Sequence, residues 1–295
     1  AGMVRKSGQP FLIDLRAGDY RLVLEPERGG SIALFEWRGR AILRPTCGPS
    51  MLDTACFPLV PFSNRIASGR FSYGGMPVRL NPNLSGTAHP LHGYGWLSEW
   101  QIVEASASSA LLEHRYPAGG EWPWRYVARQ RFDLEATGLV MALSITNLGA
   151  SAMPAGLGYH PYFQRYPQTR YLGRHTGEWQ NSQDCLPVRL DARAEAIDWW
   201  CGQPVGNRIV DTVYGGRSGA LAITHPDQGL TITLSPSENL PFTVVYTPDG
   251  EDYFCVEPVS HITNAHNLDR KDNGLVDLLP GQSLCVECHV RAEAA

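Results

Sequence analysis

Two segments far apart in the chain each place an ionisable side chain directly before a proline. GLGYHPYF, residues 156–163, contains His160, and YFCVEPVSHITNAHN, residues 253–267, contains Glu257. A residue before proline is restricted to extended geometry, so the direction of each side chain is fixed. Imidazole and carboxylate are the groups that most often transfer protons near neutral pH. The two segments therefore offer an acid and a base.

Strand alternation predicts the neighbours of both groups. Two glycines and Tyr162 share the face of His160, whereas Tyr253 and Cys255 share the face of Glu257. Partial burial among such neighbours raises the pKa of a carboxyl and strengthens it as a proton acceptor. Each group also has a structural alternative: a histidine that hydrogen-bonds a loop, and a glutamate paired with an arginine.

Three further segments carry hydrogen-bonding side chains. They are FPLVPFSNRIASGRFSYGG at 57–75 with Asn64 and Arg65, HPLHGYGW at 89–96 with His89, His92 and Trp96, and NRIVDTVYGG at 207–216 with Asp211. An arginine fork suits the oxygens of a sugar or a carboxylate, and a neutral histidine with flat aromatics suits a polar ring with apolar faces. Arg65 is equally able to clamp a carboxylate within the protein, and Asp211 to cap a turn.

The elements that position these groups are predicted to be strands. Short apolar or alternating runs recur from FLIDL at 11–15 to LCVECHV at 284–290, separated by Gly, Pro, Asn or Asp clusters. Gly and Pro make up 52 of 295 residues, and no stretch keeps a helical apolar period over three turns. We expect one all-β domain over residues 1–295, with at least a dozen strands in two large antiparallel sheets packed face to face.

Two long stretches, about 44–97 and 160–215, are predicted to be irregular loops. They are rich in aromatic residues, Arg and His, and long loops on a rigid scaffold often carry ligand sites. At the N-terminus, residues 1–8 are expected to be a flexible lead or a tag remnant.

Composition excludes several functions. A net charge of −4 without a basic block argues against nucleic-acid binding. Neither Lys6 nor Lys271, the two lysines, resembles the desolvated amine of Schiff-base chemistry. No apolar run reaches the ~18 residues of a membrane span, and no signal peptide is visible, so a cytoplasmic location is expected. Seven cysteines, an odd number in a chain of this length, are expected to be reduced and mostly buried.

Taken in order, the motifs resemble those of the aldose 1-epimerase family, the galactose mutarotases. The matching motifs are NRI at 64–66, HG at 92–93, YHPYF at 159–163, the isolated Asp211, and CVEP with NAHN within 255–267. The resemblance implies a β-supersandwich fold and interconversion of the α and β anomers of a free aldose, without metal or organic cofactor.

The resemblance also implies residue roles. His160 would be the general acid and Glu257 the general base, while Arg65, His92 and Asp211 would bind sugar hydroxyls. Asn64 and Trp96 are expected beside them in the substrate site. The expected partner is a small-molecule aldose, with the protein a monomer or a homodimer. A bell-shaped dependence of activity on pH follows from the acid–base pair.

Other interpretations remain open at this point. One is a carbohydrate-binding protein without turnover, and another is a hexose 6-phosphate mutarotase with Arg70, Arg79 or Arg170 at the phosphate. A metal site would use His261 and His266 with Glu257, or His89 with His92. The sequence CVECH at 285–289 matches a haem-attachment signature, but strand alternation directs its two cysteines to opposite faces.

Overall fold

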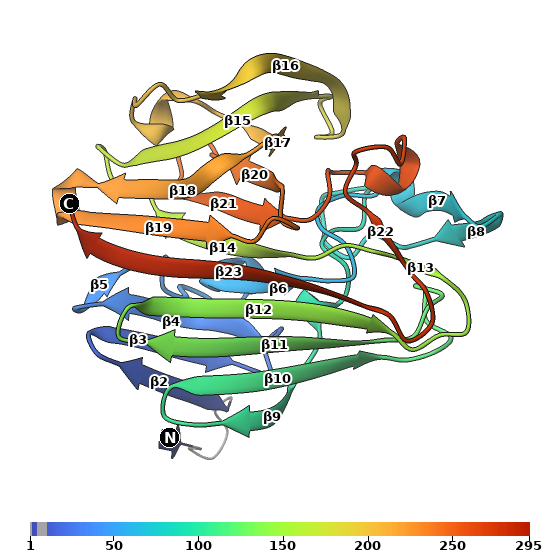
Figure 1. Ribbon diagram of the computed structural model, residues 1–295, viewed down its shortest axis with the longest axis horizontal. Helices are drawn as coiled ribbons and strands as arrows, with labels where there is room; N and C mark the ends of the chain where they lie inside the picture. Colours follow the sequence, from blue (N-terminus) through green and yellow to red (C-terminus); the bar gives the residue numbers. More distant parts are fainter. Residues whose placement is uncertain (1, 5–10) are drawn as a thin grey trace.

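The computed structural model describes residues 2–4 and 11–295, and nearly all of the regular structure in these ranges is β-strand (Figure 1). Nineteen strands form one continuous antiparallel ladder, which folds back on itself into two layers. The predicted all-β fold with large antiparallel sheets is therefore confirmed. None of the helices in the described residues is long and apolar enough to cross a membrane.

The first layer contains, in order of pairing, β9 (Gln101–Ala105), β10 (Ser109–Tyr116), β11 (Tyr126–Glu135), β12 (Gly138–Asn147), β23 (Ser283–Ala294), β19 (Leu230–Pro236) and β18 (Ser218–His225). The second contains β17 (Asp211–Gly215), β20 (Phe242–Tyr246), β21 (Tyr253–Val259), β14 (Gly158–Gln164), β6 (Cys56–Leu59), β4 (Ser31–Trp37), β3 (Tyr20–Glu25), β2 (Leu12–Ala17) and β1 (Gly2–Val4). β15 (Arg170–Asn181) pairs with both β17 and β18 and so joins the layers.

The remaining elements are short or peripheral. β5 (Arg40–Ala41) pairs with β4, β16 (Pro187–Asp198) with β15, β7 (Arg70–Tyr73) with β8 (Met76–Arg79), and β13 (Met153–Ala155) with β22 (Val276–Leu278). The described 3₁₀ helices are single turns: η1 (Met51–Asp53), η2 (Ala67–Gly69), η3 (Gly95–Leu97), η4 (Val205–Asn207), η5 (Pro226–Gln228) and η6 (Ala265–Asn267).

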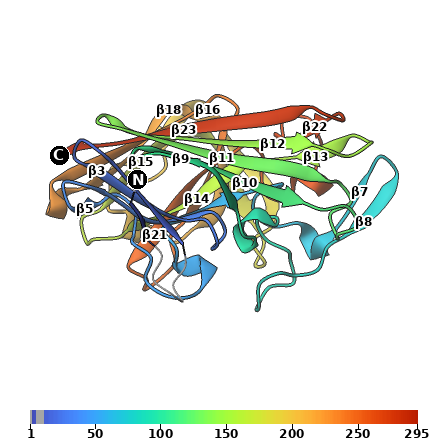
Figure 2. The ribbon, with the colours of Figure 1, turned by 90° about the horizontal axis from the view of Figure 1, so that it is seen from below.

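The main core lies between the two layers, which Figure 2 shows one above the other. Strand alternation sends Tyr159 of β14 and Phe254 of β21 into this core. Their neighbours Tyr162 and Cys255 belong to a second cluster on the opposite face of the second layer. Burying one such aromatic side chain contributes roughly 1.5–3 kcal/mol, so the register of these strands is strongly fixed. The second face is free to carry a site.

One expected loop is instead regular structure. The stretch 160–215 contains β15 and β16, twelve residues each, rather than a long irregular segment. The inward positions of β15 include Gly173, His175 and Gly177, and β16 is exposed along most of its length. Neither strand therefore shows the apolar alternation on which the prediction relied. The stretch 44–97 is mostly irregular, as predicted, but it also contains the short strands β6, β7 and β8 and single helical turns.

The two terminal regions test the expected N-terminal lead and the haem-attachment signature CVECH. Of the predicted N-terminal lead, residues 2–4 form β1, which pairs with β2, and the rest lies outside the described residues. Near the C-terminus, Cys285 is exposed and Cys288 is buried on β23, so the two thiols of CVECH point to opposite faces. One haem cannot bridge them. All seven cysteines are free, but only Cys56, Cys255 and Cys288 are buried.

Candidate active site

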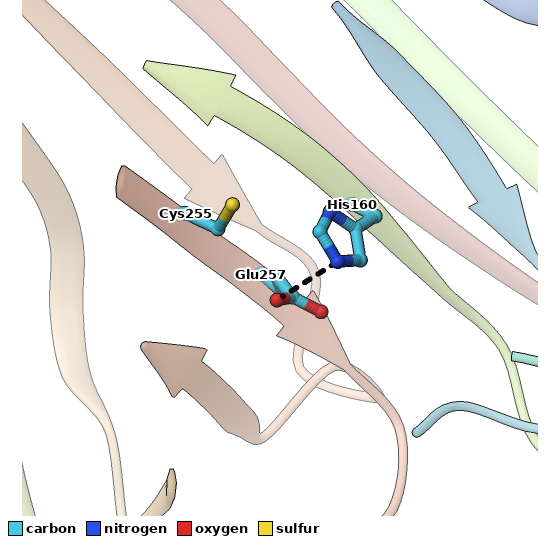
Figure 3. A group of neighbouring side chains, drawn as sticks. All are labelled: His160, Cys255 and Glu257. Atoms are coloured by element: carbon cyan, nitrogen blue, oxygen red, sulfur yellow. Dashed lines mark ion pairs between the residues drawn. The ribbon is translucent and has the colours of Figure 1, made fainter. Parts of the chain in front are cut away.

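The register of β14 and β21 brings His160 and Glu257 together. Gly158 pairs with Val259 and Tyr162 with Cys255, which sets His160 level with Glu257 on the adjacent strand. Imidazole Nε2 lies 3.3 Å from carboxylate Oε1 (Figure 3). Two side chains 97 positions apart in the sequence thus lie side by side on one face of the second layer.

Burial shifts the pKa values of this pair in opposite directions. The side chains of His160 and Glu257 are only 8% and 2% exposed. Desolvation penalises the charged form of each group, so it raises the pKa of Glu257 well above its usual value and lowers the pKa of His160 to about 3. The nearby Asp211 raises the pKa of Glu257 further, and Arg65 opposes this.

The raised pKa of Glu257 agrees with the sequence-based expectation, whereas the expected imidazolium does not hold for His160. Reference pKa values of about 4.3 and 6.5 would give a carboxylate beside an imidazolium. Because both groups are desolvated, the buried pair instead favours neutral glutamic acid beside neutral imidazole. The carboxyl Oε2 and the imidazole Nδ1 are both buried without a hydrogen-bond partner in the described residues.

Arg65, Asn64 and Asp211 form a second polar cluster at the pocket. Arg65 Nη2 lies 3.2 Å from Asp211 Oδ2, and Asn64 Oδ1 accepts hydrogen bonds from the backbone N–H and Nη1 of Arg65. Asp211 begins β17, where it pairs with Tyr246 of β20. The guanidinium is therefore clamped to a carboxylate within the protein, as the structural alternative expected, and it also lines the pocket.

The His92 ring is held in one tautomer. The backbone N–H of Asn64 donates to His92 Nδ1 at 3.1 Å, which leaves Nε2 to carry the proton. Burial, reinforced by His160 and Arg65, lowers the pKa of His92 well below its usual value, so the ring is neutral. Asn64 and His92 both adopt left-handed backbone angles, with φ of 59° and 62°. The backbone of Asn264, in the NAHN motif, donates to the Arg65 carbonyl and braces the same loop.

The pocket formed by these groups has a volume of about 180 Å³, on the order of one monosaccharide. Its polar lining contains Asn64, Arg65, His92, His160, Asp211 and Glu257. Six of the seven residues singled out from the sequence as catalytic or substrate-binding thus lie together. The remaining lining residues are Leu52, Leu84, Leu91, Tyr162, Tyr246 and Tyr253. No motif marked the leucines, because isolated apolar residues in loops carry no pattern of their own.

Trp96 does not line the pocket. Its ring is 1% exposed and stacks on Phe57 at 5.2 Å, and its Nε1 donates to the carbonyls of Leu91 and Gly93. Phe57 in turn stacks on His160 at 4.5 Å. The side chain expected to contact sugar therefore supports the loop of His92 and the ring next to the imidazole, because its indole N–H is already satisfied by the backbone.

The metal sites considered from the sequence do not form. Nε2 of His261 accepts from the backbone of Ser63, and His89 bonds Ser68 and Asp184 rather than facing an ion with His92. In the described residues, the group able to hold an ion is His160, Cys255 and Glu257, whose ligand atoms lie within 4.8 Å of one another (Figure 3). This group is the buried acid–base pair itself with one thiol added.

Fold and site together define a class of protein. The family model of aldose 1-epimerases matches residues 12–291, and the chain belongs to this family.

Individual relatives are similar over nearly the whole chain. The uncharacterized protein YphB of Escherichia coli K12 is 34% identical over 278 residues, which cover 90% of this chain and 94% of that protein. A crystal structure from Escherichia coli K12 with a provisional aldose 1-epimerase designation is 32% identical, with a TM-score of 0.88 and coverage of 96% and 99%. A galactose mutarotase-like protein from Clostridium acetobutylicum, 20% identical with a TM-score of 0.86 and coverage of 99% and 98%, shares the fold.

Proposed function

We propose that this protein is an aldose 1-epimerase that interconverts the α and β anomers of a free, unphosphorylated aldose. The observation that carries the proposal is the buried pair of His160 and Glu257, 3.3 Å apart, in a pocket that also presents Arg65, His92 and Asp211. Membership in the aldose 1-epimerase family supports it. A protein that only binds sugar has no need of an acid and a base at one point.

The chemistry requires two proton transfers at one carbon. Transfer of the pair's proton from Glu257 to Nε2 of His160, 3.3 Å away, first gives the reacting form, a carboxylate beside an imidazolium. Glu257 then takes the proton from the anomeric hydroxyl while His160 gives a proton to the ring oxygen, and the bond between carbon 1 and the ring oxygen breaks. The product is the open-chain aldehyde, with neutral glutamic acid and neutral imidazole left in the pocket. This is the form of the pair that burial favours. Rotation about the bond between carbons 1 and 2 then exposes the other face of the aldehyde.

Ring closure reverses both transfers. The imidazole takes the proton of the hydroxyl that becomes the ring oxygen, and the glutamic acid returns a proton to the aldehyde oxygen. Atoms and protons balance over the cycle, and no redox partner is needed. Each positioned transfer contributes roughly 10²- to 10⁴-fold to the rate. Arg65, Asp211 and the Nε2–H of His92 would hold hydroxyls of the sugar during the rotation.

The charges around the pocket favour a sugar without phosphate. The guanidinium of Arg65, the one cationic side chain among the described residues that line the pocket, is paired with Asp211. Arg70, Arg79 and Arg170, the candidates for a phosphate contact, lie outside the lining. The carboxylate of Asp211 would oppose the binding of a phosphate dianion in the pocket.

The decisive experiment follows anomer exchange directly. Freshly dissolved α-glucose and α-galactose are monitored by polarimetry or by NMR of the anomeric protons, with and without enzyme, and then a panel of aldoses and their 6-phosphates is compared. We expect faster equilibration of at least one free aldose. Sugar binding without faster exchange would identify a carbohydrate-binding protein, and preference for a 6-phosphate would identify the other alternative.

A further inference from the structure

Arg44 is a buried cation without a carboxylate partner among the described residues. The residue is 6% exposed, and no acidic side chain of the described chain lies within ion-pair distance of it. Its Nη2 donates to the carbonyls of Leu52 and Thr54 at 2.7 and 3.2 Å, and its Nε is buried without a partner. Burying an uncompensated charge is costly, so its position calls for a physical reason.

The guanidinium packs against two tyrosine rings of the pocket. Its central carbon is 4.2 Å from the ring centre of Tyr162 and 4.6 Å from that of Tyr253. Both rings line the pocket, as does Leu52, whose carbonyl the guanidinium binds. The backbone N–H of Arg44 also donates to the carbonyl of Tyr162 at 2.8 Å. Arg44 therefore contacts three residues that line the pocket, Leu52, Tyr162 and Tyr253, although it does not line the pocket itself.

Tyr162 connects Arg44 to His160, the proposed general acid. The Tyr162 ring stacks on the imidazole of His160 at 4.8 Å with an interplanar angle of 30°. The Phe57 ring also stacks on the imidazole, at 4.5 Å and 26°, and lies 6.2 Å from the Tyr162 ring. Phe57, His160, Tyr162, Arg44 and Tyr253 thus form one packed cluster, in which the Tyr162 ring also meets the Tyr253 ring edge-on at 5.5 Å. Because Tyr162 contacts both the imidazole and the guanidinium, protonation of His160 would place two cations against the same aromatic ring.

The ionisable groups that face His160 come from several elements. Glu257 and Cys255 lie on β21, His92 lies in the HG loop, and Tyr162 lies on β14 itself. Of these, only the carboxylate form of Glu257 favours a charged imidazole. The positive charge of Arg44 acts in the other direction and lowers the pKa of His160, in addition to the larger effect of burial.

We propose that Arg44 is a positioning residue of the candidate active site: it packs against Tyr162 and Tyr253, the tyrosine wall of the pocket, and so fixes both this wall and the ring that stacks on His160. Its charge also acts against a positive charge on the imidazole. The inference rests on the proposed function for its effect on turnover, but its effect on His160 does not. The Arg44 guanidinium touches neither of the reacting groups directly.

The test compares two substitutions with different chemistry. Arg44→Met keeps the length of the side chain and removes its charge, whereas Arg44→Lys keeps the charge and removes the planar fork. Arg28→Met is the control, because Arg28 also donates to two loop carbonyls and has a buried Nε but does not contact the pocket tyrosines. Unlike Arg44, Arg28 has a carboxylate partner, Glu25, at 3.4 Å. The pKa of His160 is measured by NMR of labelled histidine, with a His160→Gln spectrum for assignment, and kcat and KM for anomer exchange are measured separately.

We expect Arg44→Met to raise the pKa of His160 by roughly one unit and to lower kcat/KM by about tenfold. Arg44→Lys should leave the pKa of His160 close to that of the wild type and raise KM, because the charge stays while the tyrosine wall loosens. Arg28→Met should change neither quantity.

An unchanged pKa of His160 in Arg44→Met, or an equal shift in Arg44→Lys, would overturn the electrostatic part of the inference. An unchanged KM in both variants would overturn the positioning part. If Arg44→Met does not fold, a KM in Arg44→Lys equal to that of the wild type decides against the inference. Wild-type protein without anomer exchange would contradict the proposed function, and the titration of His160 would still test the role of Arg44.

Discussion

At the scale of single residues, burial sets the chemistry of His160 and Glu257. Each charged form loses hydration in the pocket, and in the described residues neither Glu257 Oε2 nor His160 Nδ1 has a hydrogen-bonding partner that would restore it. The two groups therefore hold one proton between them over a wide pH range. Epimerisation needs such a pair, because the proton count of the site is the same before ring opening and after it.

Removing either member should abolish rapid turnover while leaving a pocket for sugar. We predict that His160→Gln and Glu257→Gln each lower kcat at least about a hundredfold, since each removes one positioned proton transfer. Sugar affinity, measured by calorimetry, should stay within about tenfold of the wild type. Glu25→Gln is the matched control, because Glu25 is also buried with a raised pKa but lies outside the pocket. Near-normal exchange in either active-site variant would remove that residue from the mechanism.

The dependence of activity on pH should be a bell with a broad top. Acid inactivates when the pair takes up a second proton, and the pKa of His160, about 3, places this limb at low pH. Alkali inactivates when the pair loses its last proton, and the raised pKa of Glu257 moves this limb upward. Profiles of kcat/KM are measured where fluorescence shows folded protein. Limbs at about 4.3 and 6.5, the values of the free groups, would contradict desolvation of the pair.

At the scale of elements, three loops and four strands meet at the pocket, and close backbone contacts set their positions. Gly93, next to His92, has φ of 69°, and a Cβ there would lie 2.1 Å from the carbonyl oxygen of Val60. That oxygen accepts the N–H groups of Tyr94 and Gly95. The HG motif thus requires glycine for both its left-handed backbone angle and its close contact with Val60 and Pro61, the two residues that follow β6.

Gly93→Ala should therefore destabilise the fold more than an alanine at an open left-handed glycine. Gly74 provides the control, because its φ of 57° is similar and no atom of the described residues lies within 4 Å of the point that a Cβ would occupy. We predict that the free energy of unfolding of Gly93→Ala, from denaturant titration, falls at least about 1 kcal/mol further than that of Gly74→Ala. Sugar affinity should fall as well, since His92 moves with the loop. Equal losses in the two variants would show that the Val60 contact is unimportant.

At the scale of the whole molecule, buried neutral histidines make the fold sensitive to acid. Burial lowers the pKa to about 4 for each of His114, His175, His225 and His261. Below pH 6.5 the unfolded chain therefore binds protons that the folded protein does not, so the free energy of unfolding falls as the pH decreases from about 6.5 to about 4. The raised pKa values of Glu25 and Glu257 contribute in the opposite direction.

We predict that the free energy of unfolding decreases steadily from pH 6.5 to pH 4, with up to about 1.4 kcal/mol per pH unit from each such histidine. Denaturant titrations at several pH values measure the slope. In His114→Phe, which keeps a ring against Trp100 and Tyr126, the slope should decrease by about one proton equivalent. A slope equal to that of the wild type would show that His114 is not a neutral buried group.

Much of the fold and the site could be predicted from the sequence, because strand alternation is a local property. The parity around His160 and around Glu257 placed Tyr162 and Cys255 on the site face and Tyr159 and Phe254 in the core. The β15–β16 hairpin was missed, since β16 is exposed along most of its length and has no apolar alternation to detect. The role of Trp96 was missed because a sequence does not show whether an indole N–H is already satisfied.

The amino-acid sequence by itself determined which groups are available for proton transfer, that each lies in a short strand before a proline, and which face of its strand it occupies. Only the tertiary structure decided that His160 and Glu257 lie 3.3 Å apart, that both are desolvated, and that Arg44 packs on the Tyr162 ring beside His160. The reason is physical: alternation depends on neighbours along the chain, whereas distance and desolvation depend on strands that pair across a hundred residues.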